Sequence, residues 1–187
     1  MMLEVRSMIE ELKKLISEKA LLIDEKRGFE LASGGKSSYF FDMKMVTLDP
    51  QGANLIARCL FEKIKDCDAK YVGGLESGAI PIVTSLCMVS WEEKKPLYGF
   101  YVRKEQKKRG TRKTIEGNIE PGEKVIIVDD VVTQGKSVLK AIEEVRKMGC
   151  EVVKVVSVID REEGARENLK NVGIDLDALF TKSDFGL

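Results

Sequence analysis

The sequence contains no histidine, and its four cysteines stand far apart without a CxxC pair. Structural zinc sites need Cys and His ligands at close spacing, so these absences exclude such a site. The preferred interpretation is that the cysteines are reduced, mostly buried thiols in a cytosolic protein. They are Cys59, Cys67, Cys87 and Cys150.

The chain also lacks an excess of either charge, because 31 Lys and Arg residues balance 31 Asp and Glu residues. This balance excludes an overall basic field for nucleic acid or membrane surfaces, and leaves only local clusters to act electrostatically. No apolar run approaches membrane-spanning length, and residues 1–22 carry Glu and Lys throughout, which is typical of an amphipathic helix and not of a signal peptide. We therefore expect one soluble, cytoplasmic domain over residues 1–187, with no nucleic-acid or membrane partner.

Apolar strand patterns alternate with helical patterns along most of the chain. This alternation predicts an α/β fold with a parallel sheet covered by helices on both faces. Strands are expected at 39–44 (or an extended loop), 71–74, 96–102, 124–128, 151–159 and 177–181. Helices are expected at 3–23, at 51–64 with Asp49 as N-cap, at 80–90, at 135–149 and from about 162. Ligands of such sheets bind beyond the carboxyl ends of the strands, so each loop that follows a strand is a candidate site wall.

The segment VIIVDDVVTQGKS, residues 125–137, joins two adjacent acids to a turn of the kind that binds phosphate. A P-loop would need glycine five positions before Gly135, where the chain has Asp130. The dinucleotide-binding pattern also fails, because its middle glycine position within GGLESG (73–78) is Leu75. Neither of these nucleotide motifs is present.

What remains is still chemically specific. Gly135, Lys136 and Ser137 open the 135–149 helix, whose free N–H groups and dipole favour an anion. Ionised carboxylates only accept hydrogen bonds, so Asp129 and Asp130 suit the hydroxyls of a ribose that carries the phosphate, and they would stabilise positive charge that develops on its ring. The alternative is an ordinary acidic turn that caps a helix.

This segment resembles the signature of type I phosphoribosyltransferases, in which an apolar strand, two acids and a Thr-x-Gly turn bind 5-phosphoribosyl 1-pyrophosphate (PRPP). The resemblance implies a five-stranded parallel sheet with a small N-terminal hood, formed here mainly by about residues 1–45. It also implies ribose 5-phosphate in the 133–137 turn, with the acids on the ribose hydroxyls. The PRPP-binding residues implied in this segment are Asp129, Asp130, Val131, Val132, Thr133, Gln134, Gly135, Lys136 and Ser137.

Residues 29–53 resemble the hood of one branch of that family, the orotate phosphoribosyltransferases. In that branch the aromatic pair, here Phe40 and Phe41, lines the pyrimidine pocket. Core packing is the alternative for two adjacent Phe residues. Because neighbouring side chains on a strand face opposite sides, we expect at most one of them to stack on the base.

The segment RKEQKKRGTRK, residues 103–113, holds seven Lys or Arg residues against one acid, Glu105. It follows the 96–102 strand, so closing over a pyrophosphate is favoured over a merely solvated basic loop. Orotate phosphoribosyltransferases carry a similar loop that acts on the neighbouring subunit's active site, which implies a homodimer here. The matching residues are Arg103, Lys104 and Lys107. The family usually has His-Gly after these lysines, whereas this chain has Arg109 before the glycine. Because Arg is a poor proton donor near neutral pH, we expect Arg109 to neutralise the charge of the pyrophosphate. Any general acid catalysis is then left to Lys107.

Two further segments complete the resemblance. In SVIDREEGA (157–165), Arg161 matches the Arg that binds the carboxylate of orotate, for which a guanidinium fork is well suited; an ordinary surface Arg is the alternative. Residues 73–82 resemble the pyrophosphate loop, so Glu76, Ser77 and Gly78 are expected at the diphosphate. Magnesium, the implied cofactor, is expected to be held mainly by PRPP and water, without direct protein ligands.

The four motifs together identify the chain as a member of the orotate phosphoribosyltransferases. The implied reaction transfers 5-phosphoribosyl from PRPP to orotate, giving orotidine 5′-monophosphate and pyrophosphate in pyrimidine biosynthesis. The implied catalytic residues are Lys107, Arg109, Asp129 and Asp130, and the orotate-binding residues are Phe40, Phe41, Thr133 and Arg161. Two alternatives remain open: a phosphoribosyltransferase for another nucleobase, and a non-catalytic regulator that binds PRPP.

Overall fold

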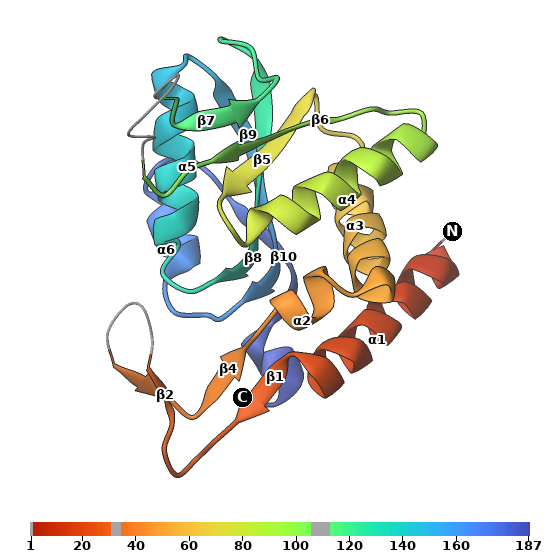
Figure 1. The fold of residues 1–187 in the computed structure, drawn as a ribbon, viewed down its shortest axis with the longest axis vertical. Helices are drawn as coiled ribbons and strands as arrows, with labels where there is room; N and C mark the ends of the chain where they lie inside the picture. The colour runs from red at the N-terminus through yellow and green to blue at the C-terminus, as the bar shows by residue number, and fades with distance from the viewer. Residues whose placement is uncertain (1, 31–34, 106–112) are drawn as a thin grey trace.

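The computed structural model describes residues 2–30, 35–105 and 113–187, arranged around one large sheet (Figure 1). The helices are α1 (Met2–Lys19), α2 (Lys44–Thr47), α3 (Pro50–Ile64), α4 (Ala79–Glu92), α5 (Lys136–Lys147), α6 (Ala165–Lys170) and the 3₁₀ turn η1 (Lys182–Phe185). The sheet strands are β5 (Tyr71–Leu75), β6 (Tyr98–Val102), β7 (Ile115–Gly117), β8 (Lys124–Val132), β9 (Glu151–Asp160) and β10 (Leu176–Thr181). Four short strands precede them: β1 (Leu21–Ile23), β2 (Phe29–Glu30), β3 (Lys36–Ser37) and β4 (Tyr39–Phe41).

The large sheet has the strand order β10-β9-β8-β5-β6-β7. Five neighbouring strands run parallel, as predicted, and β7 adds an antiparallel edge in which Ile115 pairs with Val102. This sixth strand was not predicted. Its three residues, Ile-Glu-Gly, are too few to display an alternating pattern, and β7 is defined by its pairing with β6.

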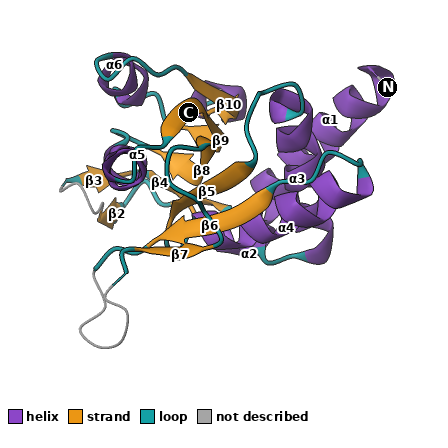
Figure 2. Ribbon diagram, turned by 90° about the horizontal axis from the view of Figure 1, so that it is seen from above, coloured by secondary structure: helices purple, strands orange, loops and turns teal. Residues whose placement is uncertain are grey.

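Helices cover both faces of the sheet, which confirms that prediction (Figure 2). Along β8, Ile126 and Val128 pack on the side of α1, α3 and α4, whereas Val125 and Ile127 pack on the side of α5 and α6. All four side chains are fully buried. A strand enclosed on both faces reads as a continuous apolar run, which is why KVIIV carries no alternation of apolar and polar residues.

The N-terminal helix is shorter than expected. The apolar pattern predicted a helix over 3–23, but α1 ends at Lys19 and Leu21–Ile23 form β1, which pairs antiparallel with β4. The pairing with residues 39–41, which local periodicity does not report, decides the conformation of this segment. Within the predicted hood of residues 1–45, α1 packs into the main core with α3, and β1 and β4 lie beside η1 and the C-terminus (Figure 1).

The prediction of Asp49 as a helix cap is confirmed. Its carboxylate accepts hydrogen bonds from the N–H groups of Gln51 at 3.0 Å and Gly52 at 2.9 Å, and Pro50 occupies the first helical position. Gly52 lies so close to the preceding helix that a Cβ there would stand 2.3 Å from the carbonyl oxygen of Val46. This close approach holds α2 against α3 and fixes the path from the short strands into the core.

Two boundaries near the predicted site differ from expectation. β8 does not end at Val128 but runs on through both acids to Val132, because these residues pair with β9. The helix expected from about residue 162 begins at Ala165, so the loop that carries Arg161 is longer.

All four cysteines are free thiols, with Cys59 and Cys150 buried. No helix in the described part of the chain has the length and apolar composition needed to cross a bilayer.

Candidate active site

The turn between β8 and α5 forms a small cavity at the carboxyl edge of the sheet. Gly135 caps α5 with φ 78°, a left-handed conformation that favours glycine. The first N–H groups of α5 have no partner within the helix and face this turn. The side chain of Asn168 in α6 donates to the carbonyl of Gln134 at 2.8 Å and anchors the turn from outside. The cavity measures about 140 Å³ and is lined by Asp129, Val131, Val132, Thr133, Gly135, Lys136 and Ser137. The predicted phosphate turn therefore exists as a shaped space at a helix N-terminus.

The two acids lie within the last four residues of β8. Asp129 is only 6% exposed, and its Oδ1 accepts from the backbone N–H of Asp130 at 3.0 Å. The Oδ1 of Asp130 accepts from the N–H of Val131 at 2.8 Å. Burial, and then the negative charge of Asp130, raise the pKa of the Asp129 carboxyl well above its usual range. Among the described residues, neither carboxylate forms an ion pair, so both retain acceptor capacity for a ligand's hydroxyls.

The loop between β5 and α4 lies directly against these acids. A Cβ on Gly78 would stand 2.5 Å from Oδ1 of Asp130, so only a glycine permits this approach without displacement. Gly74, the penultimate residue of β5, also lies close to β8: a Cβ there would stand 2.1 Å from the carbonyl oxygen of Val128. The peptide bond between Glu76 and Ser77 is cis. The predicted pyrophosphate loop and the predicted ribose acids therefore share one surface.

The carboxylate of Glu76 contacts the start of the basic segment. Its Oε1 accepts from the N–H of Lys104 at 2.9 Å, and its Oε2 lies 3.9 Å from Nη1 of Arg103. The N–H of Arg103 also donates to the carbonyl of Thr114 at 2.8 Å, and Lys140 of α5 donates its Nζ to the carbonyl of Lys104. Glu76 thus fixes the start of the basic segment beside the acids. The remaining calls on this segment, Lys107 and Arg109, lie outside the described residues.

Arg161 is buried at the end of β9, which rules out an ordinary surface position. Its side chain is 4% exposed, and its Nη2 lies 2.9 Å from Oε1 of Glu163 and donates to Oγ of Ser37 at 3.2 Å. The guanidinium carbon lies 4.6 Å from the ring centroid of Tyr39, within cation–π range. Its Nε is buried without a hydrogen-bond partner in the described residues. A buried donor of this kind is suited to an incoming acceptor.

Of the predicted aromatic pair, Phe41 belongs to the core. It is 5% exposed, and its ring lies 5.2 Å from that of Phe185 and 5.8 Å from that of Tyr39. Its ring packs in the core cluster, which favours the core-packing alternative for Phe41. Phe40 is half-buried with its ring 5.8 Å from that of Phe29, which leaves it as the candidate of the pair.

Sequence reasoning missed the three side chains that surround Arg161: Ser37, Tyr39 and Glu163. Tyr39 and Glu163 stand next to quoted motif residues, and alternation along β4 offered one signal, since Tyr39 and Phe41 share a face that Phe40 does not. No signal links Ser37 to Arg161, because 124 residues separate them.

A larger cavity lies away from this edge, between α1, α3 and α4. It measures about 560 Å³ and is lined by Glu4, Val5, Ser7, Met8, Arg58, Phe61, Glu62, Val89 and Glu93. Its cation, Arg58, already pairs with Glu92 at 2.9 Å and with Glu93 at 3.5 Å. Because it adjoins none of the strand ends that bear the motifs, we assign the chemistry to the smaller cavity.

Within the described residues, no cluster of three His, Cys, Asp or Glu side chains is arranged to hold a metal ion. Mg²⁺ does not require one, because it commonly keeps several waters and binds through one or two carboxylates and a substrate's phosphates. Asp130, which is partly exposed, offers carboxylate oxygens of that kind beside the phosphate turn.

A family model described as "Phosphoribosyl transferase domain" matches residues 44–176. This span contains the 76–78 loop, both acids, the phosphate turn and Arg161, but not the four short strands.

Relatives extend the similarity to nearly the whole chain. An orotate phosphoribosyltransferase of Aquifex aeolicus is 42% identical over 175 residues, which cover 94% of this chain and 96% of the relative. A crystal structure of the Mycobacterium tuberculosis H37Rv orotate phosphoribosyltransferase has a TM-score of 0.84 at 33% identity, covering 96% of this chain and 99% of that one. A second structure of that protein, in complex with PRPP, has a TM-score of 0.80 at 32% identity, with the same coverage of both chains. The similarity therefore includes the short strands around Arg161.

Proposed function

The chain belongs to the orotate phosphoribosyltransferase family, and we propose that it transfers 5-phosphoribosyl from PRPP to orotate, giving orotidine 5′-monophosphate and pyrophosphate. One observation carries the choice of orotate: the buried guanidinium of Arg161, with its unpaired Nε, at the same sheet edge as the phosphate turn. This transfer is a step of pyrimidine biosynthesis.

The phosphoribosyl group occupies the end of β8 in this proposal. The 5-phosphate lies in the 133–137 turn, where helix N–H groups and the Thr133 and Ser137 hydroxyls donate to it. Asp129 and Asp130 accept from the ribose hydroxyls. As the bond from C1′ to the pyrophosphate oxygen breaks, positive charge develops on the ribose ring, and the two carboxylates stabilise it.

The pyrophosphate leaves with the electron pair of that bond. Backbone N–H groups of residues 77–79 face it, since the N–H of Glu76 already donates to the carbonyl of Val102. Arg103 and Lys104 neutralise its charge from the position in which Glu76 holds them. Lys107 and Arg109 are assigned to the same leaving group on the resemblance, with Lys107 as the proton donor if one is needed.

Orotate binds on the β9 side. Its carboxylate accepts hydrogen bonds from the guanidinium of Arg161, while N1 forms the new bond to C1′ and its proton passes to water. Thr133 and Phe40 are assigned to orienting the ring. A charged hydrogen bond of this kind contributes about 1.5–3 kcal/mol, enough to favour orotate over uracil by about tenfold or more.

Magnesium fits this arrangement as a cofactor carried by PRPP. When bound, the ion neutralises charge on the diphosphate. Asp129 and Asp130 are placed to contact its waters, and the other interactions of the transfer are made by the protein side chains named above.

We also assign to the protein a cytoplasmic homodimer in which the basic segment of one subunit serves its partner's site. The test is subunit complementation. Lys107→Ala and Asp129→Asn are each expected to be nearly inactive, and co-refolding them should restore activity in the one site per mixed dimer that lacks both changes. Mixed dimers that regain no activity would contradict the shared site.

Arg161 disfavours a phosphoribosyltransferase for another base, because a base without a carboxylate would leave that guanidinium buried and incompletely paired. The buried Arg161 beside the phosphate turn also disfavours a non-catalytic regulator, because sensing PRPP alone would not require a cation for a base carboxylate.

The deciding measurement is the loss of orotate's ultraviolet absorbance after PRPP and Mg²⁺ are added, with Arg161→Ala beside the wild type. Arg58→Ala is the matched control, because it removes an Arg from α3 far from the motif-bearing loops. We expect turnover in the wild type and the control and its collapse in Arg161→Ala. Wild type that binds PRPP but leaves orotate unchanged would overturn the choice of base.

A further inference from the structure

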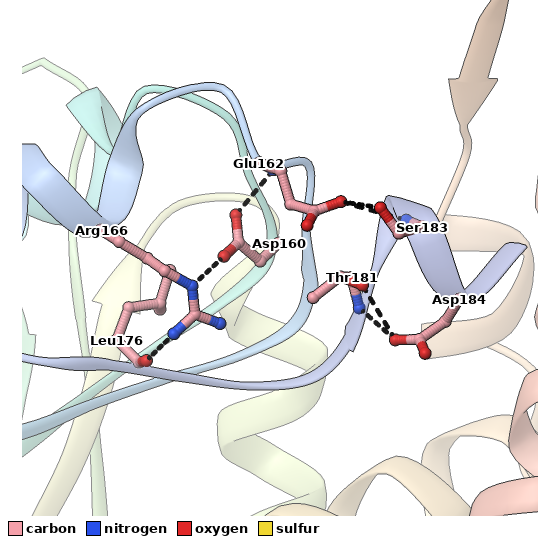
Figure 3. Close-up of polar contacts among 7 residues, drawn as sticks. All are labelled: Asp160, Glu162, Arg166, Leu176, Thr181, Ser183 and Asp184. Atoms are coloured by element: carbon pink, nitrogen blue, oxygen red, sulfur yellow. Dashed lines mark hydrogen bonds and ion pairs between the residues drawn. The ribbon is translucent and has the colours of Figure 1, made fainter. Parts of the chain in front are cut away.

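The loop that presents Arg161 is anchored by a buried acid. Asp160, which is 0% exposed, accepts from Nε of Arg166 at 2.7 Å and from the backbone N–H of Glu162 at 2.8 Å (Figure 3). Nη1 of Arg166 donates to the carbonyl of Leu176 at 2.9 Å. The N–H of Arg161 itself donates to the carbonyl of Val132 at the end of β8. The first residues of the loop are therefore fixed to both neighbouring strands.

The next residue reverses the chain. Glu162 has φ 55°, a left-handed conformation that is uncommon for a residue with a side chain. This reversal brings Glu163 back toward Arg161, and the carboxylate of Glu163 pairs with Nη2 of Arg161 at 2.9 Å. The direction of the Arg161 side chain thus depends on the conformation at Glu162.

The side chain of Glu162 is held by the C-terminal turn. Its Oε2 accepts from Oγ of Ser183 at 2.5 Å and from the N–H of Ser183 at 3.1 Å (Figure 3). These hydrogen bonds, the side-chain one first, lower the pKa of the Glu162 carboxyl, so the contact favours its ionised form. The turn η1 has its own cap, in which the carboxylate of Asp184 accepts from both the N–H and the hydroxyl of Thr181. Ser183 is therefore presented by a structured turn.

The same turn also contacts the other wall of the Arg161 pocket. The ring of Phe185 lies 5.2 Å from that of Phe41 in β4 and 5.7 Å from that of Phe180 in β10. Phe41 in turn packs edge-on against Tyr39, the ring beneath the guanidinium. One short C-terminal segment thus touches the loop above Arg161 through Ser183 and the strand below it through Phe185.

We propose that η1 contributes to the selection of the base. Ser183, through Glu162, positions Arg161 for a substrate carboxylate, and Phe185, through Phe41, fixes the position of the Tyr39 ring beneath the guanidinium. Ser183, Glu162 and Phe185 are positioning residues in this inference, since none reaches the proposed substrate. The inference rests on the proposed function. It predicts that changes at this exposed turn affect the affinity for orotate and leave the affinity for PRPP unchanged, because in the described part of the chain no hydrogen bond or ring contact joins η1 to the phosphate turn.

The test uses Ser183→Ala in the full chain. We expect the KM for orotate to rise about threefold to tenfold, the scale of an ordinary hydrogen bond, because Ser183 acts on Arg161 only through Glu162; the KM for PRPP and the Tm should be nearly unchanged. The preference for orotate over uracil should fall by a similar factor. Ser183→Thr keeps the hydroxyl and should restore the wild-type values. Ser17→Ala is the matched control, because its Oγ also makes an exposed hydrogen bond, to the carbonyl of Lys13.

Comparing Ser183→Ala, Glu162→Gln and the double variant distinguishes the effect of the shared hydrogen bond from the separate effects of the two residues. If the two residues act through their shared hydrogen bond, the effect of the pair on the orotate KM should be smaller than the sum of the single effects. An unchanged orotate KM in Ser183→Ala, or an equal rise in both KM values together with a lowered Tm, would overturn the inference. Wild type without orotate turnover would instead overturn the proposed function, and this inference with it.

Discussion

The ends of β8 and β9 lie side by side and each carries a buried acid, yet they are built in opposite ways. At the end of β9, Asp160 is saturated by Arg166 and by the backbone of Glu162. At the end of β8, Asp129 accepts one backbone hydrogen bond and has the like charge of Asp130 beside it. Asp160 has protein donors for its carboxylate and is expected to stabilise the fold. Asp129 keeps acceptor capacity for a ligand and is expected to reduce the stability of the fold.

This difference teaches how the two halves of the site are prepared. On the proposed function, the side assigned to the base is assembled in advance, because Arg161 already stacks on Tyr39 and pairs with Glu163. The side assigned to the ribose holds an uncompensated charge in the described residues, which suits a group that must stabilise a cationic ring only during the reaction. Replacing each of the two acids by its amide is therefore the most direct test of the comparison.

The largest effect is expected for Asp129→Asn. Loss of a preorganised charge at the ribose should lower kcat by about 100-fold to 1,000-fold. The fold should nevertheless gain stability at neutral pH. Because the pKa of Asp129 is raised in the folded state, that state retains its proton to higher pH than the unfolded chain, and stability is lost as pH rises from the unfolded pKa toward the folded one. The amide has no such proton.

Thermal melting checks this at several pH values. The gain in Tm of Asp129→Asn over wild type should be larger at pH 8 than at pH 4. A variant that melts below wild type at pH 8 would contradict the account of Asp129 as an uncompensated charge.

The same substitution at Asp160 should have the opposite sign. Asp160→Asn removes a buried charged acceptor from Arg166 and should reduce the free energy of unfolding by about 1–3 kcal/mol. Urea unfolding measures it. If both variants shift stability in the same direction, the contrast between the two strand ends is wrong.

A smaller effect is expected for Gly78→Ala. The new methyl group would stand 2.5 Å from Oδ1 of Asp130, so the carboxylate or the 76–79 loop must move. The backbone at Gly78 has φ −60°, which Ala adopts freely, so the expected cost falls on the site and not on the fold. We expect kcat/KM for PRPP to fall by about tenfold, since such displacements of about 1 Å impair positioning, with little change in Tm. Gly122→Ala is the contrasting variant: it has open space around it but φ +80°, so it adds backbone strain and should lower Tm without lowering kcat/KM for PRPP.

The smallest effect is expected at an exposed acid. Asp68 pairs with Lys124 at 2.6 Å, and the hydrogen bond from Lys124 lowers the pKa of Asp68. The contribution of such a group is present above its unfolded pKa and is lost as pH falls through the folded one. Because the pair is solvated, Asp68→Asn should shift Tm at pH 7 by no more than about 2 °C and leave activity unchanged. A larger shift would show that acids here affect stability without regard to burial.

The parts of this fold that the sequence predicts are those written in contiguous residues. KVIIV predicts a doubly covered strand, Asp49-Pro50 predicts a helix start, and Thr133 to Ser137 predict an anion-binding turn, because each depends on local geometry. The acids were expected at the end of a strand over 124–128, and they lie within β8 instead, because the strand runs four residues further than its apolar run.

The parts that the sequence did not predict depend on partners far along the chain. Leu21–Ile23 become a strand only through residues 39–41, and β7 exists only beside β6. The burial of Phe41 depends on Phe185, and the surroundings of Arg161 depend on Ser37. In each case the deciding contact joins residues whose spacing carries no periodic signal.

The pairing of β5 with β8 at the middle of the sheet has a consequence for how the molecule is made. Tyr71 lies opposite Val125, a separation of 54 residues (125 − 71), so this ladder cannot begin until the chain through β8 has been synthesised. Contacts of such long range form slowly, because loop closure precedes their gain in energy. β8 also carries both acids and leads into the phosphate turn. We therefore expect a nascent chain to acquire its central ladder and its PRPP site in the same late step, without a stage at which half of the protein already binds the sugar phosphate.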